Sequence, residues 1–236
     1  MSGRERLCLD LFAGVGGFSE AFEEADGWEV VTVDVEEKFD PDICADVLDL
    51  RPEDLPDADV VLVGHPCTLF STAGNHDEWD LKNRRPTGDR AKRHVAMLFH
   101  TLGLVHAISP EYWYLENPRR SRINWLIGPP TEWVTYCQYG TDYQKPTGLW
   151  GDHAPGMTYR RCKRGDPCHT SNTENDGTCA IASMDRSDHA ARSKVPYELS
   201  KAILDAVEGR LDQTQMTLIT TDGGGKSPPL HTGNEQ

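Results

Sequence analysis

Short apolar segments of strand length alternate with helical segments through the first 140 residues, and this alternation constrains the fold more than any other feature. The predicted strands are residues 6–12, 28–33, 59–63, 111–115 and 132–139. The predicted helices are residues 18–25 and a segment from Ala91, where Val95, Leu98, Phe99, Leu102 and Val105 recur at helical spacing. Strands alternating with helices predict an α/β fold with a doubly wound, mostly parallel sheet.

The remaining composition divides the chain into four parts. Residues 1–150 are expected to form the main domain, and residues 192–210 a C-terminal helix that completes it. Between them, residues 151–191 are polar and poor in aliphatic side chains, which predicts a small irregular insert. Residues 211–236 are rich in glycine and proline and predict a disordered tail.

Membrane and secreted classes are not favoured. No run approaches the roughly 18 apolar residues of a membrane helix, and Arg4 to Arg6 lead straight into the first strand without a signal peptide. The seven cysteines are scattered and odd in number, which does not indicate a disulfide framework. We therefore expect a cytoplasmic protein without membrane contact.

A glycine-rich turn follows the first predicted strand. The stretch from Asp10 to Gly17 reads Asp-Leu-Phe-Ala-Gly-Val-Gly-Gly, and glycines let a ligand approach main-chain N–H groups. Asp34, which closes the second strand, could accept hydrogen bonds from ribose hydroxyls. Asp46 is a candidate for an adenine amino group, with a capping or surface position as the alternative. No Gly-Lys-Ser/Thr follows, so a triphosphate site is not indicated.

Two further motifs follow later strands. Cys67 lies in Gly-His-Pro-Cys-Thr-Leu-Phe-Ser, a polar loop where a reactive thiol is expected, although a buried cysteine is usually inert. Glu116 and Asn117 follow the strand at residues 111–115. Glu116 could cap the local structure, or it could share a proton with the edge of a base. Because all these motifs lie at strand ends, they should meet at one edge of the sheet.

The three motifs, in this order and spacing, resemble the cytosine-C5 DNA methyltransferase family. The resemblance covers about residues 6–150 and resumes near 192–207. It implies a Rossmann-like, S-adenosylmethionine-dependent fold in which the cytosine is flipped out and Cys67 attacks its C6. Glu116 and Asn117 would act beside Cys67. The implied cofactor-binding residues are Asp10, Phe12, Ala13, Gly14, Gly16, Gly17, Asp34, Val35, Asp46, Val47, Pro66 and Ser193.

The chain departs from the family pattern at several positions. Many members have an aromatic residue where Val35 stands, and the best-known members have Val at Pro118. The family's Gln-x-Arg-x-Arg segment, which supports the nucleophile loop, is matched here by Tyr143-Gln144-Lys145-Pro146-Thr147. Lys145 would then replace one arginine as a point charge, and Arg119 or Arg120 could compensate for the other. Near the C-terminus only Val-Pro of the usual Gly-Asn-x-Val-Pro is kept.

The net charge of −14 is unusual for a protein that binds nucleic acid, but the basic residues are clustered. The candidates for nucleic-acid contact are Arg84, Arg85, Arg119, Arg120 and Arg122. DNA is the expected partner; the alternatives are the same chemistry on RNA, or a catalytically silent binder of cofactor or DNA. The small size favours a viral or accessory enzyme. Abundant Asp with 8 Lys against 16 Arg also fits a halophilic protein, with an ordinary acidic protein as the alternative.

The predicted insert carries four potential metal ligands, Cys162, Cys168, His169 and Cys179, within 18 residues. Cysteine and histidine bind zinc tetrahedrally, and a bound ion would explain how so polar a segment folds. The alternative is a set of free thiols with an unrelated histidine.

Overall fold

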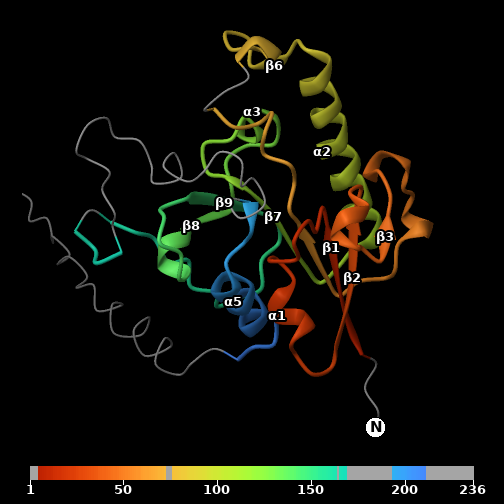
Figure 1. Ribbon diagram of the computed structural model, residues 1–236, viewed down its shortest axis with the longest axis vertical. Coiled ribbons are helices and arrows are strands. Elements are labelled where there is room, and N and C mark those ends of the chain that lie inside the picture. The colour runs from red at the N-terminus through yellow and green to blue at the C-terminus, as the bar shows by residue number, and fades with distance from the viewer. Residues whose placement is uncertain (1–4, 73–75, 164, 169–192, 211–236) are drawn as a thin grey trace, which may run out of the picture.

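A computed structural model describes residues 5–72, 76–163, 165–168 and 193–210 (Figure 1). Its seven-stranded sheet comprises β1 (Arg6–Leu11), β2 (Trp28–Asp34), β3 (Ile43–Cys44), β4 (Val60–Val63), β7 (Tyr112–Pro118), β8 (Glu132–Thr135) and β9 (Pro146–Trp150). A separate hairpin pairs β5 (Trp79–Asp80) with β6 (Arg85–Pro86). The α-helices are α1 (Glu20–Glu23), α2 (Asp89–Ile108), α3 (Ile123–Leu126) and α5 (Tyr197–Val207). Single 3-10 turns are η1 (Glu37–Phe39), η2 (Val47–Asp49), η3 (Pro52–Asp54), η4 (His76–Glu78) and η5 (Tyr136–Tyr139).

The strand order is β3-β2-β1-β4-β7-β9-β8, and the first five strands are parallel. The predicted doubly wound, mostly parallel sheet is therefore confirmed. The chain leaves β1 toward β2 on one side and returns to β4 on the other, so the order reverses between β1 and β4. This reversal is where ligands bind in open α/β sheets, and both the glycine-rich turn and the Cys67 loop lie there.

The far edge of the sheet differs from the prediction. Strand β9 was not expected; it runs antiparallel between β7 and β8. Its burial is continuous rather than alternating, so its sequence carries no period-2 pattern. The predicted strand 132–139 ends at Thr135 and continues as η5, and β7 extends through Glu116 and Asn117 to Pro118 because β9 pairs with that extension.

Two apolar clusters cover the two faces of the sheet. On one face Val60 and Leu62 of β4 pack under α1 and α5; on the other Val61 and Val63 pack under α2. Figure 1 shows α1 beside α5, with α2 on the opposite side. Each fully buried aliphatic side chain contributes roughly 1.5–3 kcal/mol. Alternate residues of one short strand therefore hold both helical layers in place.

The helices differ modestly from expectation. The segment predicted as a helix over 18–25 has only one α-helical turn, Glu20–Glu23, and α2 begins at Asp89, two residues before Ala91. Phe99, assigned to the apolar face of α2, is 49% exposed. Within the described ranges, no helix is both long and apolar enough to span a lipid bilayer.

The first part of the predicted insert follows the edge strand β8. The Thr135 N–H donates to the Arg160 carbonyl at 3.1 Å, and the Arg161 Nε donates to the Trp133 carbonyl at 3.1 Å. These bonds cover part of the edge of the sheet. Two of the predicted zinc ligands, His169 and Cys179, lie outside the described residues, as does the predicted tail from 211 to 236.

Candidate active site

The Cys67 loop is a tight turn at the carboxyl end of β4. The N–H groups of Phe70 and Ser71 both donate to the Cys67 carbonyl, at 3.1 and 2.8 Å. Gly64 brings the loop close to the β1 turn, since a Cβ there would lie 3.0 Å from the Phe12 carbonyl oxygen. The Cys67 side chain is partly exposed, so a substrate can reach it.

Arg122 holds the main chain of this loop in place. Its side chain is 1% exposed, and its Nη1 donates to the carbonyls of Leu69 (3.3 Å) and Ser71. Its main-chain N–H donates to the Phe70 carbonyl at 2.8 Å. Burial lowers the pKa of the Arg122 guanidinium. The prediction that Arg122 contacts nucleic acid is therefore wrong, because its guanidinium is buried against loop carbonyls.

Arg119 and Arg120, the expected substitutes for the missing loop support, are both exposed. The Arg119 guanidinium lies over the Trp133 ring, 3.7 Å from its centroid. Neither arginine has a described hydrogen bond to the Cys67 loop. In this chain Arg122 provides the support instead, and no local pattern distinguishes it from its two basic neighbours.

Glu116 lies at the centre of a buried polar cluster. Its Oε1 accepts hydrogen bonds from the Tyr136 hydroxyl at 2.9 Å and from the Lys145 ammonium at 3.1 Å. Glu116 is 5% exposed and Lys145 7%. Burial alone would lower the pKa of Lys145, but the charges of Glu116 and Cys67 outweigh burial and raise it. Lys145 therefore stays a cation beside both predicted catalytic groups, whereas Tyr136 was missed because its segment was predicted as a strand.

Asn117 ties β7 to the Cys67 loop. Its side-chain Nδ2 donates to the His65 carbonyl at 2.8 Å, and both residues are buried. The His65 ring packs between Phe12 and Phe70, with centroids 5.1 and 5.2 Å away. Burial, with the neighbouring His94, lowers the pKa of His65 to about 3, so its ring is neutral. The Asn117 side chain thus holds the main chain of the Cys67 loop in position.

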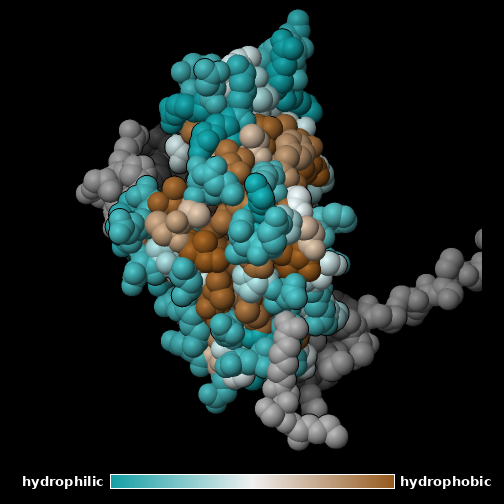
Figure 2. Space-filling model, turned by 90° about the vertical axis from the view of Figure 1, so that its right-hand side faces the viewer, coloured by the Kyte–Doolittle hydropathy of each residue, from teal (hydrophilic) through white to brown (hydrophobic). Residues whose placement is uncertain are grey.

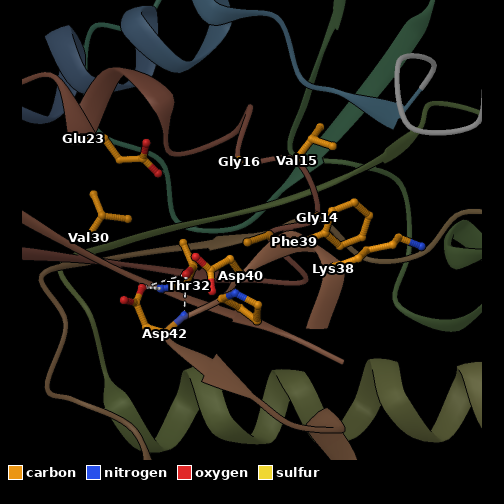
Figure 3. A pocket seen from close by; sticks show the side chains of 12 residues that line it. Gly14, Val15, Gly16, Glu23, Val30, Thr32, Lys38, Phe39, Asp40 and Asp42 are labelled. Atoms are coloured by element: carbon orange, nitrogen blue, oxygen red, sulfur yellow. Dashed lines mark hydrogen bonds between the residues drawn. The ribbon is translucent and has the colours of Figure 1, made fainter. Parts of the chain in front are cut away.

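The glycine-rich turn lines a cavity of about 560 Å³ (Figure 3). Ala13, Gly14 and Gly16 form one wall, and side chains of β2 and the η1 segment face them. Gly14 and Gly16 have positive φ angles, +53° and +76°, and a Cβ on Gly14 would meet no atom within 4 Å. Open space beside a glycine lets a ligand approach the backbone closely, as a cofactor-binding turn requires.

The two acidic residues predicted to bind the cofactor hold the structure around it. Asp34 accepts hydrogen bonds from the N–H groups of Gly14 and Glu36, each at 2.9 Å, and so ties the turn to the end of β2. Asp46 caps η2 by accepting from the Leu48 N–H at 3.1 Å, and it pairs with Arg93. Asp46 therefore occupies a capping position, and its contact with an adenine amino group stays a prediction.

The other predicted cofactor residues are spread around the turn. Val35 is 62% exposed, and Phe12 and Pro66 are partly exposed. Ser193 is exposed on the segment before α5. Asp10 is fully buried at the end of β1, directly before the turn. Burial raises the pKa of Asp10 to about 7, against the opposing effect of Ser19.

Two of the predicted cofactor residues also have roles in packing. The Val47 side chain is buried in the apolar cluster under α2, which leaves its main chain for the predicted contact. Gly17 lies against the C-terminal segment, where a Cβ would stand 2.5 Å from Lys194 Cγ and 2.6 Å from the Val195 carbonyl oxygen. Gly17 is required for this close approach, and its contact with the cofactor stays a prediction.

The remaining basic candidates lie in the β5–β6 hairpin. Arg84, with φ +54°, and Arg85 are both exposed, and Arg85 pairs with Asp80 at 3.4 Å. Figure 1 shows the hairpin beside the start of α2, at the end of the molecule that also carries α3. Figure 2 shows hydrophilic residues covering this end and apolar side chains across the middle of the same face. The hairpin therefore presents cations that a phosphate backbone could reach.

Comparisons with known proteins agree with this arrangement. The family model for C-5 cytosine-specific DNA methylases matches residues 7–121, a range that holds the glycine-rich turn, Cys67 and Glu116. A Frog virus 3 (isolate Goorha) protein named "Probable DNA (cytosine-5)-methyltransferase" is 30% identical over 173 residues, 68% of this chain and 76% of that protein.

One bacterial protein and one solved structure are also similar to this chain. The type II methyltransferase M.Bsp6I of Bacillus sp. (strain RFL6) is 34% identical over 117 residues, 45% of this chain and 34% of that protein. This chain therefore spans about a third of the bacterial relative's length. The structure of the Entamoeba histolytica methyltransferase EhMeth aligns with a TM-score of 0.45 at 11% identity, over 68% of this chain and 58% of that chain.

Proposed function

Because the chain belongs to the DNA (cytosine-5)-methyltransferase family, we propose that it methylates C5 of cytosine in DNA through a covalent bond between Cys67 and C6. The observation that carries the proposal is the buried contact between Glu116, Lys145 and Tyr136 beside the Cys67 loop. Cytosine C5 is a weak nucleophile, so an enzyme must first activate the ring covalently. A thiol and a carboxyl group near one buried cation supply that activation.

Lys145, Glu116 and Tyr136 have separate roles in the proposed reaction. Lys145 stabilises the Cys67 thiolate that attacks C6, and the new S–C6 bond moves electron density toward C5. Glu116, once protonated at Oε2, provides the proton for N3 and accepts a hydrogen bond from the exocyclic amine. Lys145 and Tyr136 both bind Oε1 of Glu116, which fixes the carboxyl group and directs Oε2 to the base. After methyl transfer a base removes the C5 proton and the S–C6 bond breaks. N3 then returns its proton to Glu116, and the Cys67 thiolate is regained.

S-adenosylmethionine, when bound, supplies the electrophilic methyl group. The cavity against Ala13, Gly14 and Gly16 fits this cofactor, since it combines open space with exposed main chain. Asp34 would receive the ribose hydroxyls through the remaining lone pairs of its carboxylate. The flipped base would enter from the side of the Cys67 loop, with phosphates near Arg84, Arg85, Arg119 and Arg120.

Transfer of labelled methyl groups to cytosine-containing DNA and RNA tests the proposal. We expect label in DNA, none with Cys67→Ser, and transfer retained with Cys44→Ser, whose exposed thiol on β3 contacts the Val35 carbonyl and is not part of the Cys67 loop. A duplex with 5-fluorocytosine should trap a covalent adduct, because fluorine at C5 cannot be removed as a proton. Label in RNA alone would reject the DNA substrate. Absence of both label and adduct over a range of KCl concentrations would reject the chemistry.

A further inference from the structure

Three cysteine side chains converge at the edge of the sheet opposite β3. Cys137 comes from η5, and Cys162 and Cys168 come from the segment that follows β9. Their sulfur atoms all lie within 4.8 Å of one another. Cys137 is buried and the other two are partly exposed. Residues from two separate parts of the chain therefore bring three sulfur ligands to one point.

The spacing suits a tetrahedral metal ion. Zn–S bonds of about 2.3 Å at tetrahedral angles place sulfur atoms about 3.8 Å apart. The three thiols would need to shift by less than about 1 Å to reach this spacing. Soft sulfur ligands in a tetrahedral arrangement select zinc over magnesium or calcium.

The surroundings of the sulfurs also favour a bound cation. The Gln138 side chain donates Nε2–H to Cys168 Sγ at 3.1 Å and to Asp166 Oδ2 at 3.2 Å. Such donors to the sulfur of a thiolate orient metal ligands. Asp166 also accepts from the Lys163 N–H at 2.7 Å, which closes a turn between Cys162 and Cys168. The turn that separates the two cysteines is thus held by hydrogen bonds.

We propose that Cys137, Cys162 and Cys168 supply, as thiolates, three of the four ligands of a structural zinc ion. This set differs from the one predicted from sequence, because it recruits Cys137 from the main domain. The ion would link η5 to the segment beside β8 that contains Cys162 and Cys168. Tyr136, whose hydroxyl binds Glu116, is the residue directly before Cys137. The site therefore also steadies one wall of the proposed active site.

Metal analysis of protein purified without a histidine tag tests the site independently of activity. We expect about one zinc per chain in the wild type and in Cys44→Ser, and loss of zinc in Cys137→Ser and Cys168→Ser. Cobalt reconstitution of the chelator-treated protein should give thiolate-to-metal charge-transfer absorption, absent in both cluster variants. Wild-type protein without zinc would overturn the proposal, and so would cluster variants that keep it.

A second measurement on the wild type does not depend on whether the cluster variants fold. Chelation of the ion should make three additional thiols reactive toward a thiol reagent. If mass spectrometry of the non-reduced protein instead shows a disulfide between two of the three cysteines, the site is redox-linked and the zinc proposal fails. Because zinc content and methyl transfer are measured separately, failure of this proposal can be distinguished from failure of the proposed function.

Discussion

Replacement of Arg122 by alanine tests whether this residue supports the Cys67 loop or contacts DNA. The side chain donates to the carbonyls of Leu69 and Ser71 and is 1% exposed. Hydrogen bonds from a charged donor contribute about 1.5–3 kcal/mol each. The Leu69 carbonyl keeps a second donor, Trp79 Nε1 at 2.9 Å, so part of the loss is compensated there. We expect Arg122→Ala to reduce the free energy of unfolding by about 2–5 kcal/mol.

We expect Arg122→Ala to lower the rate of methyl transfer more than it lowers the affinity for DNA. A displacement of about 1 Å in a reacting group can cost about 100-fold in rate. Single-turnover methyl transfer by Arg122→Ala should therefore slow by about two orders of magnitude at saturating DNA and cofactor. Arg122→Lys keeps the charge but not the geometry of the guanidinium, and it should recover only part of the rate.

Arg120→Ala is the matched control, because Arg120 is exposed on the same turn. Loss of a phosphate contact weakens binding and reduces its dependence on salt, without slowing a saturated single turnover. The two variants should therefore differ. Arg122→Ala should lower the single-turnover rate, whereas Arg120→Ala should lower the salt-dependent affinity for DNA. A folded Arg122→Ala protein with the wild-type rate and a shallower salt dependence would refute the assignment of Arg122 to the loop.

Three further substitutions test other buried positions. Lys145→Met removes the cation beside Glu116 and Cys67, and we expect the single-turnover rate to fall about 10- to 100-fold with little change in cofactor affinity by calorimetry; an unchanged rate would contradict it. Asp10 has a folded-state pKa of about 7, raised above the usual 3.8, so its contribution to stability is full below pH 4 and is lost as the pH rises through 7. Asp10→Asn should therefore remove up to about 4 kcal/mol of this pH dependence in urea unfolding, and an unchanged profile would contradict the shift. Gly17→Ala places a Cβ 2.6 Å from the Val195 carbonyl oxygen and should lower the thermal midpoint through a loss of about 1–3 kcal/mol, whereas an unchanged midpoint would show that the C-terminal segment can move aside.

Patterns within a few residues of one another predict much of the fold. The glycine-rich turn, the strand that ends at Asp34 and the loop after Val63 lie where their sequences indicate. Each depends on local requirements: a run of apolar side chains, a positive φ or the end of a strand. Strand β9 was not predicted because its strand conformation depends on pairing with β7 and β8, which lie on either side of it in the sheet.

The same distinction explains which site residues the sequence could not reveal. Tyr136, Arg122 and Cys137 act through contacts with residues that are distant along the chain. The sequence around Gln144 suggested a weakened support for the Cys67 loop, because it lacks both family arginines. In the fold this work is divided: Lys145 pairs with Glu116, and Arg122, from the turn after β7, holds the loop carbonyls. A departure from a family motif therefore indicates a lost activity only after the space around the loop has been searched for another residue that supplies the same contacts.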